Sequence, residues 1–228
     1  MGFLDVIIKA FEKEISHVSN ANLVLKDSKK IGLDKNKTLI IQTLCVNFEI
    51  VNSTKEQEFD YEIYMSEENS LSDISVVIVN NTENKEITIT LKKARNIGNC
   101  RVVFHLPLDF DVKVFNGNGN VKIKDSKFHT LGISSSNGNV KIGNSKIDNI
   151  NIELGNGNIK IEEGITFMDA KLATQNGNIK VVLGGISCKI STNSAHGNIK
   201  LSNVISDLSS ENKLTCTTIN GNIKISGI

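Results

Sequence analysis

A five-residue motif, Gly-Asn-[Val/Ile]-Lys-[Ile/Val/Leu], occurs six times in the second half of this 228-residue chain. Successive copies are separated by 19, 19, 20, 20 and 24 residues. The copies begin at Gly119, Gly138, Gly157, Gly177, Gly197 and Gly221. A short, regular period of strand-forming residues is typical of a solenoid, in which each repeat is one coil stacked on the next. The sequence therefore predicts an all-β solenoid with coils of about 20 residues.

Alternation along the motif strand separates its interior from its exterior. The apolar residues two and four positions after each glycine point inward, and the lysine between them points outward. A second strand precedes each glycine, with inward positions such as Leu131 and Ile133 in one coil. The glycine allows a tight corner, and the asparagines on either side of it are expected to stack as side-chain ladders. His196 replaces one of these asparagines.

The outward lysines form the candidate functional site, because every other motif position has a structural task. They are Lys122, Lys141, Lys160, Lys180, Lys200 and Lys224. Only Glu162 offers an acid at the outward position two residues further on, so we expect a largely uncompensated basic stripe. Such a stripe suits a protein partner or an anionic polymer, such as an acidic glycan or a teichoic-acid-like chain. The alternative is a solvated surface copied by repeat duplication. No aromatic residues interleave with the lysines, so specific nucleic-acid binding is not expected.

The remaining chain divides into three parts of one continuous domain. Residues 1–17 place Leu4, Ile8, Phe11 and Ile15 on one helical face, which predicts an amphipathic helix capping one end of the solenoid. Residues 18–106 read as an irregular β section with degenerate coils. The first is expected at 20–29, which aligns with 118–127, and further strands are expected at 38–42, 46–51, 59–64, 74–79 and 86–91. Residues 107–228 form the regular coils.

Several classes of function find no support in the sequence. The net charge is +1, no export signal is recognisable, and no apolar run approaches 18 residues, so a cytoplasmic protein without a membrane span is expected. The four cysteines and four histidines lack metal-ligand spacing, and the cysteines are expected to be free, buried thiols. No cofactor motif is present. The acids of the repeats occupy different phases of the coil, which argues against an enzyme.

A lead-in from Val103 to Pro107, the strand Val112-x-Val114 and the serial Gly-Asn repeats together resemble the DUF4097 adhesin family of bacterial β-strand-repeat proteins. The resemblance covers residues 98–228 well and 18–97 weakly. It implies a single-stranded, right-handed β-helix with no catalytic residues to carry over.

Three functions follow from these features. The first is a non-enzymatic binding or scaffold module that presents an extended surface to its partner. The second is a self-associating structural protein, because the chain stops at Ile228 directly after a motif strand and would leave the edge of the C-terminal coil open to another copy. The third is a polysaccharide-active enzyme, which would require acids to converge in one groove.

Overall fold

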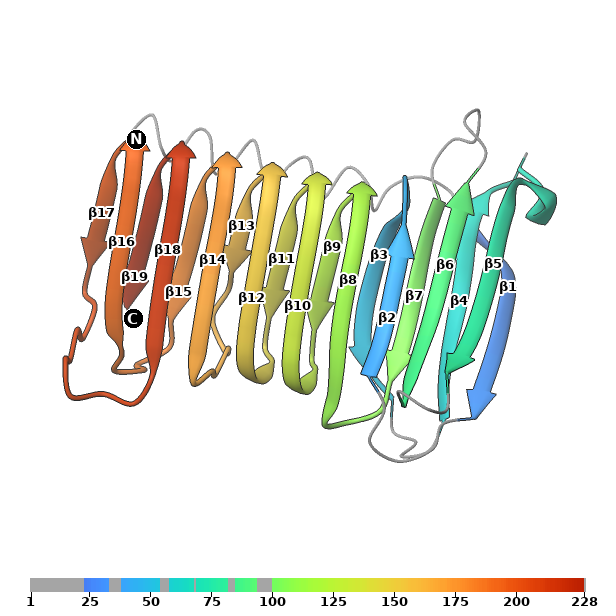
Figure 1. Cartoon of the computed structure of the whole chain (residues 1–228), viewed down its shortest axis with the longest axis horizontal. Coiled ribbons are helices and arrows are strands. Elements are labelled where there is room, and N and C mark those ends of the chain that lie inside the picture. Colours follow the sequence, from blue (N-terminus) through green and yellow to red (C-terminus); the bar gives the residue numbers. More distant parts are fainter. Residues whose placement is uncertain are drawn as a thin grey trace.

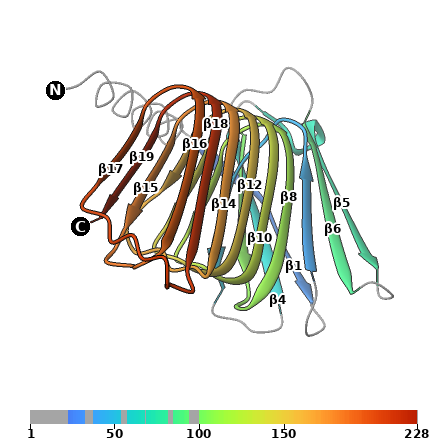
Figure 2. The same ribbon diagram turned by 60° about the vertical axis from the view of Figure 1, so that its left-hand side comes forward.

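The computed structural model describes residues 23–32, 38–53, 58–67, 69–81, 85–93 and 100–227. It is an all-β fold of two facing sheets, a ten-stranded sheet A and a nine-stranded sheet B (Figures 1 and 2). Within these ranges the single helical element is the turn η1 (Leu71–Asp73), and no helix there is long or apolar enough to cross a lipid bilayer. The predicted helix at 1–17 lies outside the described residues, and the right-handedness of the coils stays a prediction.

Each repeat forms one coil with a strand in sheet B, a glycine corner and a strand in sheet A, as the sequence predicts. Neighbouring coils pair in parallel, so that equivalent residues stack in rows. The six coils are β8 (Phe110–Asn118) with β9 (Val121–Lys124), β10 (Lys127–Asn137) with β11 (Val140–Gly143), β12 (Lys146–Asn156) with β13 (Ile159–Ile161), β14 (Asp169–Asn176) with β15 (Ile179–Leu183), β16 (Lys189–His196) with β17 (Ile199–Ser202), and β18 (Lys213–Asn220) with β19 (Ile223–Gly227).

The core lies between the two sheets and consists of the inward rows. In the coil of β10 and β11, Leu131 and Val140 are fully buried, and the neighbouring coils repeat this arrangement. Burying an aliphatic side chain of this size stabilises the fold by roughly 1.5–3 kcal/mol relative to leaving it exposed. A single layer of Val, Ile and Leu therefore stabilises each coil. Its burial is complete only where a neighbouring coil covers it on both sides.

The corner glycines are required by the close approach of successive coils. Gly138 has φ 133°, and a Cβ on it would lie 2.1 Å from the carbonyl oxygen of Gly119 in the preceding coil. Gly157 repeats the geometry, with a Cβ position 1.9 Å from the Gly138 oxygen. No side chain fits at such distances, so the spacing of the backbones selects glycine at this position.

The asparagine after each glycine belongs to an inner ladder, as predicted. Between the central coils each Oδ1 accepts hydrogen bonds from both the backbone N and the Nδ2 of the next asparagine, at 2.8–3.1 Å. At one end of the ladder the backbone N of Asn198 donates to the Oδ1 of Asn222. At the other end the Oδ1 of Asn47 accepts from the backbone N of Asn120. In spatial order the ladder is Asn47, Asn120, Asn139, Asn158, Asn178, Asn222 and Asn198.

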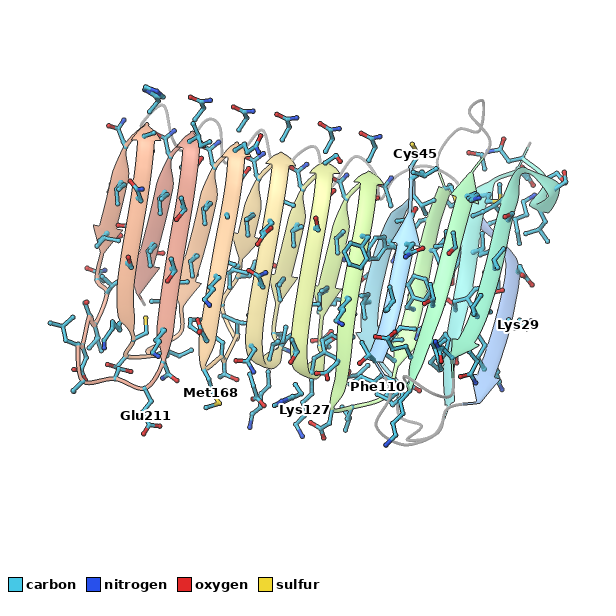
Figure 3. All side chains as sticks on the ribbon, in the orientation of Figure 1. Lys29, Cys45, Phe110, Lys127, Met168 and Glu211 are labelled. Carbon is cyan, nitrogen blue, oxygen red and sulfur yellow. The ribbon has the colours of Figure 1, made fainter. Side chains whose placement is uncertain are left out.

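The asparagine before each glycine belongs to an outer, exposed ladder, also as predicted. Each Nδ2 donates to the Oδ1 of the neighbouring coil at 2.7–2.9 Å. At one end Asn118 donates to the Sγ of Cys45 at 3.8 Å, and Cys45 lies along the corner edge of the molecule (Figure 3). At the other end His196 occupies the position beside Asn220. All four cysteines are free, but Cys45 is exposed rather than buried as expected.

The C-terminal coil does not form the end of the solenoid, which corrects the expectation that its edge is open. Strand β18 pairs with β14 on one side and with β16 on the other, and β19 lies between β15 and β17 in the same way. The final coil is therefore inserted between two coils that precede it in sequence, and β16 and β17 form the end (Figure 1). The inward residues of the two coils explain this placement. Cys216 and Ile225 of the inserted coil are apolar and fully buried, whereas Thr192 on β16 is polar and tolerates the partial exposure of the end coil.

The first half repeats this insertion and then departs from the solenoid. The coil of β2 (Thr38–Thr43) and β3 (Asn47–Asn52) lies between the β8–β9 coil and a coil formed by β6 (Glu86–Lys93) and β7 (Cys100–Leu106). Beyond these strands the pairing becomes antiparallel. β5 (Ile74–Asn81) pairs with β6, β4 (Glu58–Ser66) pairs with β7, and β1 (Leu23–Gly32) pairs with β4.

The expected coil at residues 20–29 is therefore wrong where the structure describes it. Strand β1 is the antiparallel edge of sheet A, and Leu25 at an expected core position is 53% exposed. Ala21 stands where the coils need glycine, and the coil geometry excludes a Cβ at that position. The degenerate coil is instead β2–β3, which supplies Asn47 to the inner ladder without any Gly-Asn motif.

Candidate interaction surface on sheet A

All six predicted lysines lie in one row across sheet A. Strand pairing places each directly beside the next, and inward neighbours such as Val121 and Ile123 are buried, so the row lies on the outer face of the sheet. The inserted C-terminal coil exchanges the last two members. In spatial order this lysine column is Lys122, Lys141, Lys160, Lys180, Lys224 and Lys200.

An acid that the sequence analysis missed begins the row. Glu49 on β3 pairs with Lys122, and its side chain is only 5% exposed. Its carboxylate lies 3.1 Å from the Nζ of Lys122 and 3.9 Å from that of Lys124, and it also accepts a hydrogen bond from Arg101. The available signal was the stretch 46–50, in which Asn47 and Glu49 match Asn120 and Lys122, but the missing glycine concealed it.

A second acid neutralises the middle of the column. Glu162 Oε1 lies 2.8 Å from the Nζ of Lys141 and 2.9 Å from that of Lys160. Burial raises the pKa of Glu162, but hydrogen bonds from both lysines outweigh it and hold the pKa below its ordinary value. The expectation of a largely uncompensated stripe is therefore wrong for Lys122, Lys141 and Lys160.

The other half of the column lies on β15, β19 and β17. These strands contain no acid, and their second outward row consists of Val182, Ser226 and Ser202. Lys180 and Lys224 are half-buried and take part in further interactions, while Lys200 is exposed at the end coil. Lys200 is thus the member of this half that is most open to solvent.

Beyond Glu49 the same face of sheet A carries charges of both signs. His105 Nε2 on β7 lies 3.6 Å from Glu62 Oε2 and 3.9 Å from Asp60 Oδ1, both on β4. The hydroxyl of Tyr64 donates to Glu62 at 2.6 Å, which raises the pKa of Tyr64, and the Arg101 guanidinium lies 6.0 Å from the ring centre of Tyr64. This mixed network separates the lysine column from the antiparallel end.

Three acids of the regular coils each have a separate local partner. Asp125 accepts from Asn144, Asp148 lies 3.0 Å from His129, and Asp207 accepts from the backbone and side chain of Ser209. In the described part of the chain no three His, Cys, Asp or Glu residues gather in a way that could hold a metal ion. These contacts fix turns and strand ends, which are structural tasks.

Comparison with known proteins agrees with this architecture. The sequence model of the Toastrack DUF4097 family matches residues 6–227. Among solved structures, a "putative cell adhesion protein" of Clostridium sporogenes aligns with a TM-score of 0.54 and 14% identity, over 91% of this chain and 100% of its own. A "putative adhesin" of Bacteroides fragilis aligns with a TM-score of 0.51 and 16% identity, over 91% and 97%. At these identities the likeness shows the fold. No curated protein matches the chain.

Proposed function

Because this chain belongs to the Toastrack DUF4097 family, we propose that it is a non-enzymatic binding module that presents the lysine column to a protein or an anionic polymer. The observation that carries the proposal is the unbroken register of six lysines on one face of a two-sheet solenoid. A row of cations at ~4.8 Å intervals matches a partner whose negative charges also repeat. The names of the structural neighbours are consistent with a binding role.

The acid partners and the exposure of the lysines bear on where such a partner binds. Glu49 and Glu162 already satisfy the first three lysines, so a polyanion gains little there unless it displaces a carboxylate. The strands that carry Lys180, Lys224 and Lys200 contain no acid. Lys200 is exposed at the end coil, so binding is expected to include this end of the column and to weaken as salt screens the charges.

A charge-removal experiment tests the proposal with heparin, an anionic glycan, as the probe. The triple variant Lys180→Gln, Lys200→Gln and Lys224→Gln should elute from immobilised heparin at a clearly lower salt concentration than the unaltered protein. The control removes the same charge from sheet B through Lys113→Gln, Lys171→Gln and Lys213→Gln. An equal fall in the eluting salt concentration of the two triple variants would show that retention depends on net charge alone, and would overturn the proposal.

A second candidate function, self-association, is favoured by a different observation. Apolar side chains of the end coil, including Ile199 and Leu201, are 43% and 46% exposed although they occupy inward positions. We also propose a cytoplasmic location, as the sequence predicts, and cell fractionation tests it.

A further inference from the structure

We propose that the end of the solenoid formed by β16 and β17 is a self-association surface that takes the same end of a second copy of this chain. The inference develops the second candidate function and shares only Lys200 with the lysine column. Binding to heparin and association between copies are measured separately, so the failure of one leaves the other standing.

The inserted coil creates this surface. Strands β18 and β19 have neighbours on both sides, whereas β16 and β17 are the last described strands of their sheets. In the part of the chain that the structure describes, nothing pairs with their outer edges. An unpaired edge of eight residues in one sheet and four in the other is a template for further strand pairing.

Apolar side chains accompany these edges. Ile199 and Leu201 are 43% and 46% exposed, while their row neighbours Ile223 and Ile225 are fully buried. The loop 203–212, which borders the same end, adds Ile205 at 59% exposure and a still more exposed leucine at position 208. Exposed apolar side chains gathered at an unpaired end are typical of an interaction site in a folded protein.

The arrangement of strands favours the same end of a second copy over the opposite end. β16 and β17 belong to one coil, so the two sheets finish level with each other. At the opposite end sheet A continues through β4 to β1, one strand beyond β5, which ends sheet B. A level end can pair along both sheets only with another level end. A two-fold axis between two such ends makes the strand pairing antiparallel and closes the assembly as a dimer.

Charge at this end is also self-complementary. Lys189 and Lys200 lie on the two edge strands, and Asp207 and Glu211 lie on the bordering loop, where Figure 3 shows Glu211. Two positive and two negative charges leave these four residues without net charge. Two copies can therefore approach without net repulsion, and a two-fold arrangement sets each lysine against a surface that also carries acids.

Sedimentation velocity over a concentration series of the full chain tests the proposal. We expect a dimer that grows with concentration, and a Kd at least about tenfold higher in Leu201→Asp and in Leu208→Asp. Leu208 is 78% exposed on the loop, so its substitution should not disturb the fold even if Leu201→Asp does. Ile219→Asp is the matched control, since this residue is 48% exposed on β18 outside the end surface.

Each other outcome overturns the proposal. Unaltered protein that stays monomeric at all concentrations refutes it, as does equal weakening by Ile219→Asp. Monomers that dimerise only after residues 1–17 are removed assign the surface to this chain's own N-terminal segment. Dimers that persist in both leucine variants place the contact elsewhere.

Cross-linking tests the pairing of strands directly. On a Cys45→Ser background, Asn193→Cys near the middle of β16 should form a disulfide between copies, because antiparallel pairing about a two-fold axis brings the two strand centres together. Ala173→Cys lies in the same row two coils away and is the control. Equal cross-linking by the two cysteines rejects the strand pairing.

Discussion

Replacing Asn158 by alanine removes one rung from the centre of the inner ladder. Its Nδ2 donates to Asn139 Oδ1 at 3.0 Å, and its Oδ1 accepts from the backbone N and the Nδ2 of Asn178 at 2.8 and 3.1 Å. Three hydrogen bonds are lost at roughly 1 kcal/mol each, and the half-buried backbone N–H of Asn178 is left without its acceptor. We therefore expect the free energy of unfolding to fall by about 3 kcal/mol.

The outer ladder supplies a matched control in the same coil. Asn156→Ala removes one donated and one accepted bond, at 2.9 and 2.8 Å, but Asn156 is exposed and water can take the place of both partners. Its expected cost is at most about 1 kcal/mol. Urea denaturation followed by circular dichroism measures both variants, and equal m-values are needed for the comparison. Equal losses of stability would refute the argument that the inner ladder holds the coils together.

Three further predictions concern single positions. Gly138→Ala should lower the free energy of unfolding by more than about 3 kcal/mol, because its Cβ would meet a carbonyl oxygen at 2.1 Å. The control Gly132→Ala should be close to neutral in the same urea titration, because its Cβ would find nothing nearer than 4.0 Å. Glu162→Gln should cost about 0.5–1 kcal/mol at neutral pH. Because the folded-state pKa of Glu162 is lowered, its contribution to the free energy of unfolding is present above the unfolded-state pKa and is lost as pH falls through the folded-state pKa. The stabilities of the variant and the unaltered protein should therefore converge in acid. A difference in stability that persists in acid would contradict the ion-pair account. A thiol reagent at neutral pH should modify exposed Cys45 in the folded protein and leave Cys216 intact, since burial raises the pKa of Cys216 to about 12; rapid modification of Cys216, read by mass spectrometry, would count against the buried geometry.

The repeat motif predicts the local structure of a coil well, because each of its residues has one structural task. The alternation around Lys141, the tight corner at Gly138 and the stacking of Asn139 all follow from sequence and are all present. The runs expected at 38–42 and 86–91 match β2 and β6 closely. Period-two alternation identifies such strands wherever one face is buried.

The order of the coils does not follow from sequence, because every coil presents the same rows to its neighbours. The row that contains Leu214 on β18 accepts the strand of β14 on one side and that of β16 on the other. Nothing in the motif distinguishes consecutive from inserted stacking, so the end coil was misassigned. Glu49 was missed for a related reason. The β2–β3 coil pairs in register with its neighbour but lacks the glycine that identifies the repeat in the sequence.

The insertion of the last coil has a consequence for the kinetics of folding. Strands β16 and β17 precede their pairing partners in the chain, so their sheet hydrogen bonds cannot form until residues up to 227 are available. The coil of β2 and β3 likewise waits for β8 and β9, which are about 70 residues further along. Loop closure over such separations must come before the gain from pairing, so these two coils should be the slowest to order. The time needed to complete the fold is therefore set by the β2–β3 and β16–β17 coils rather than by the regular stack between them.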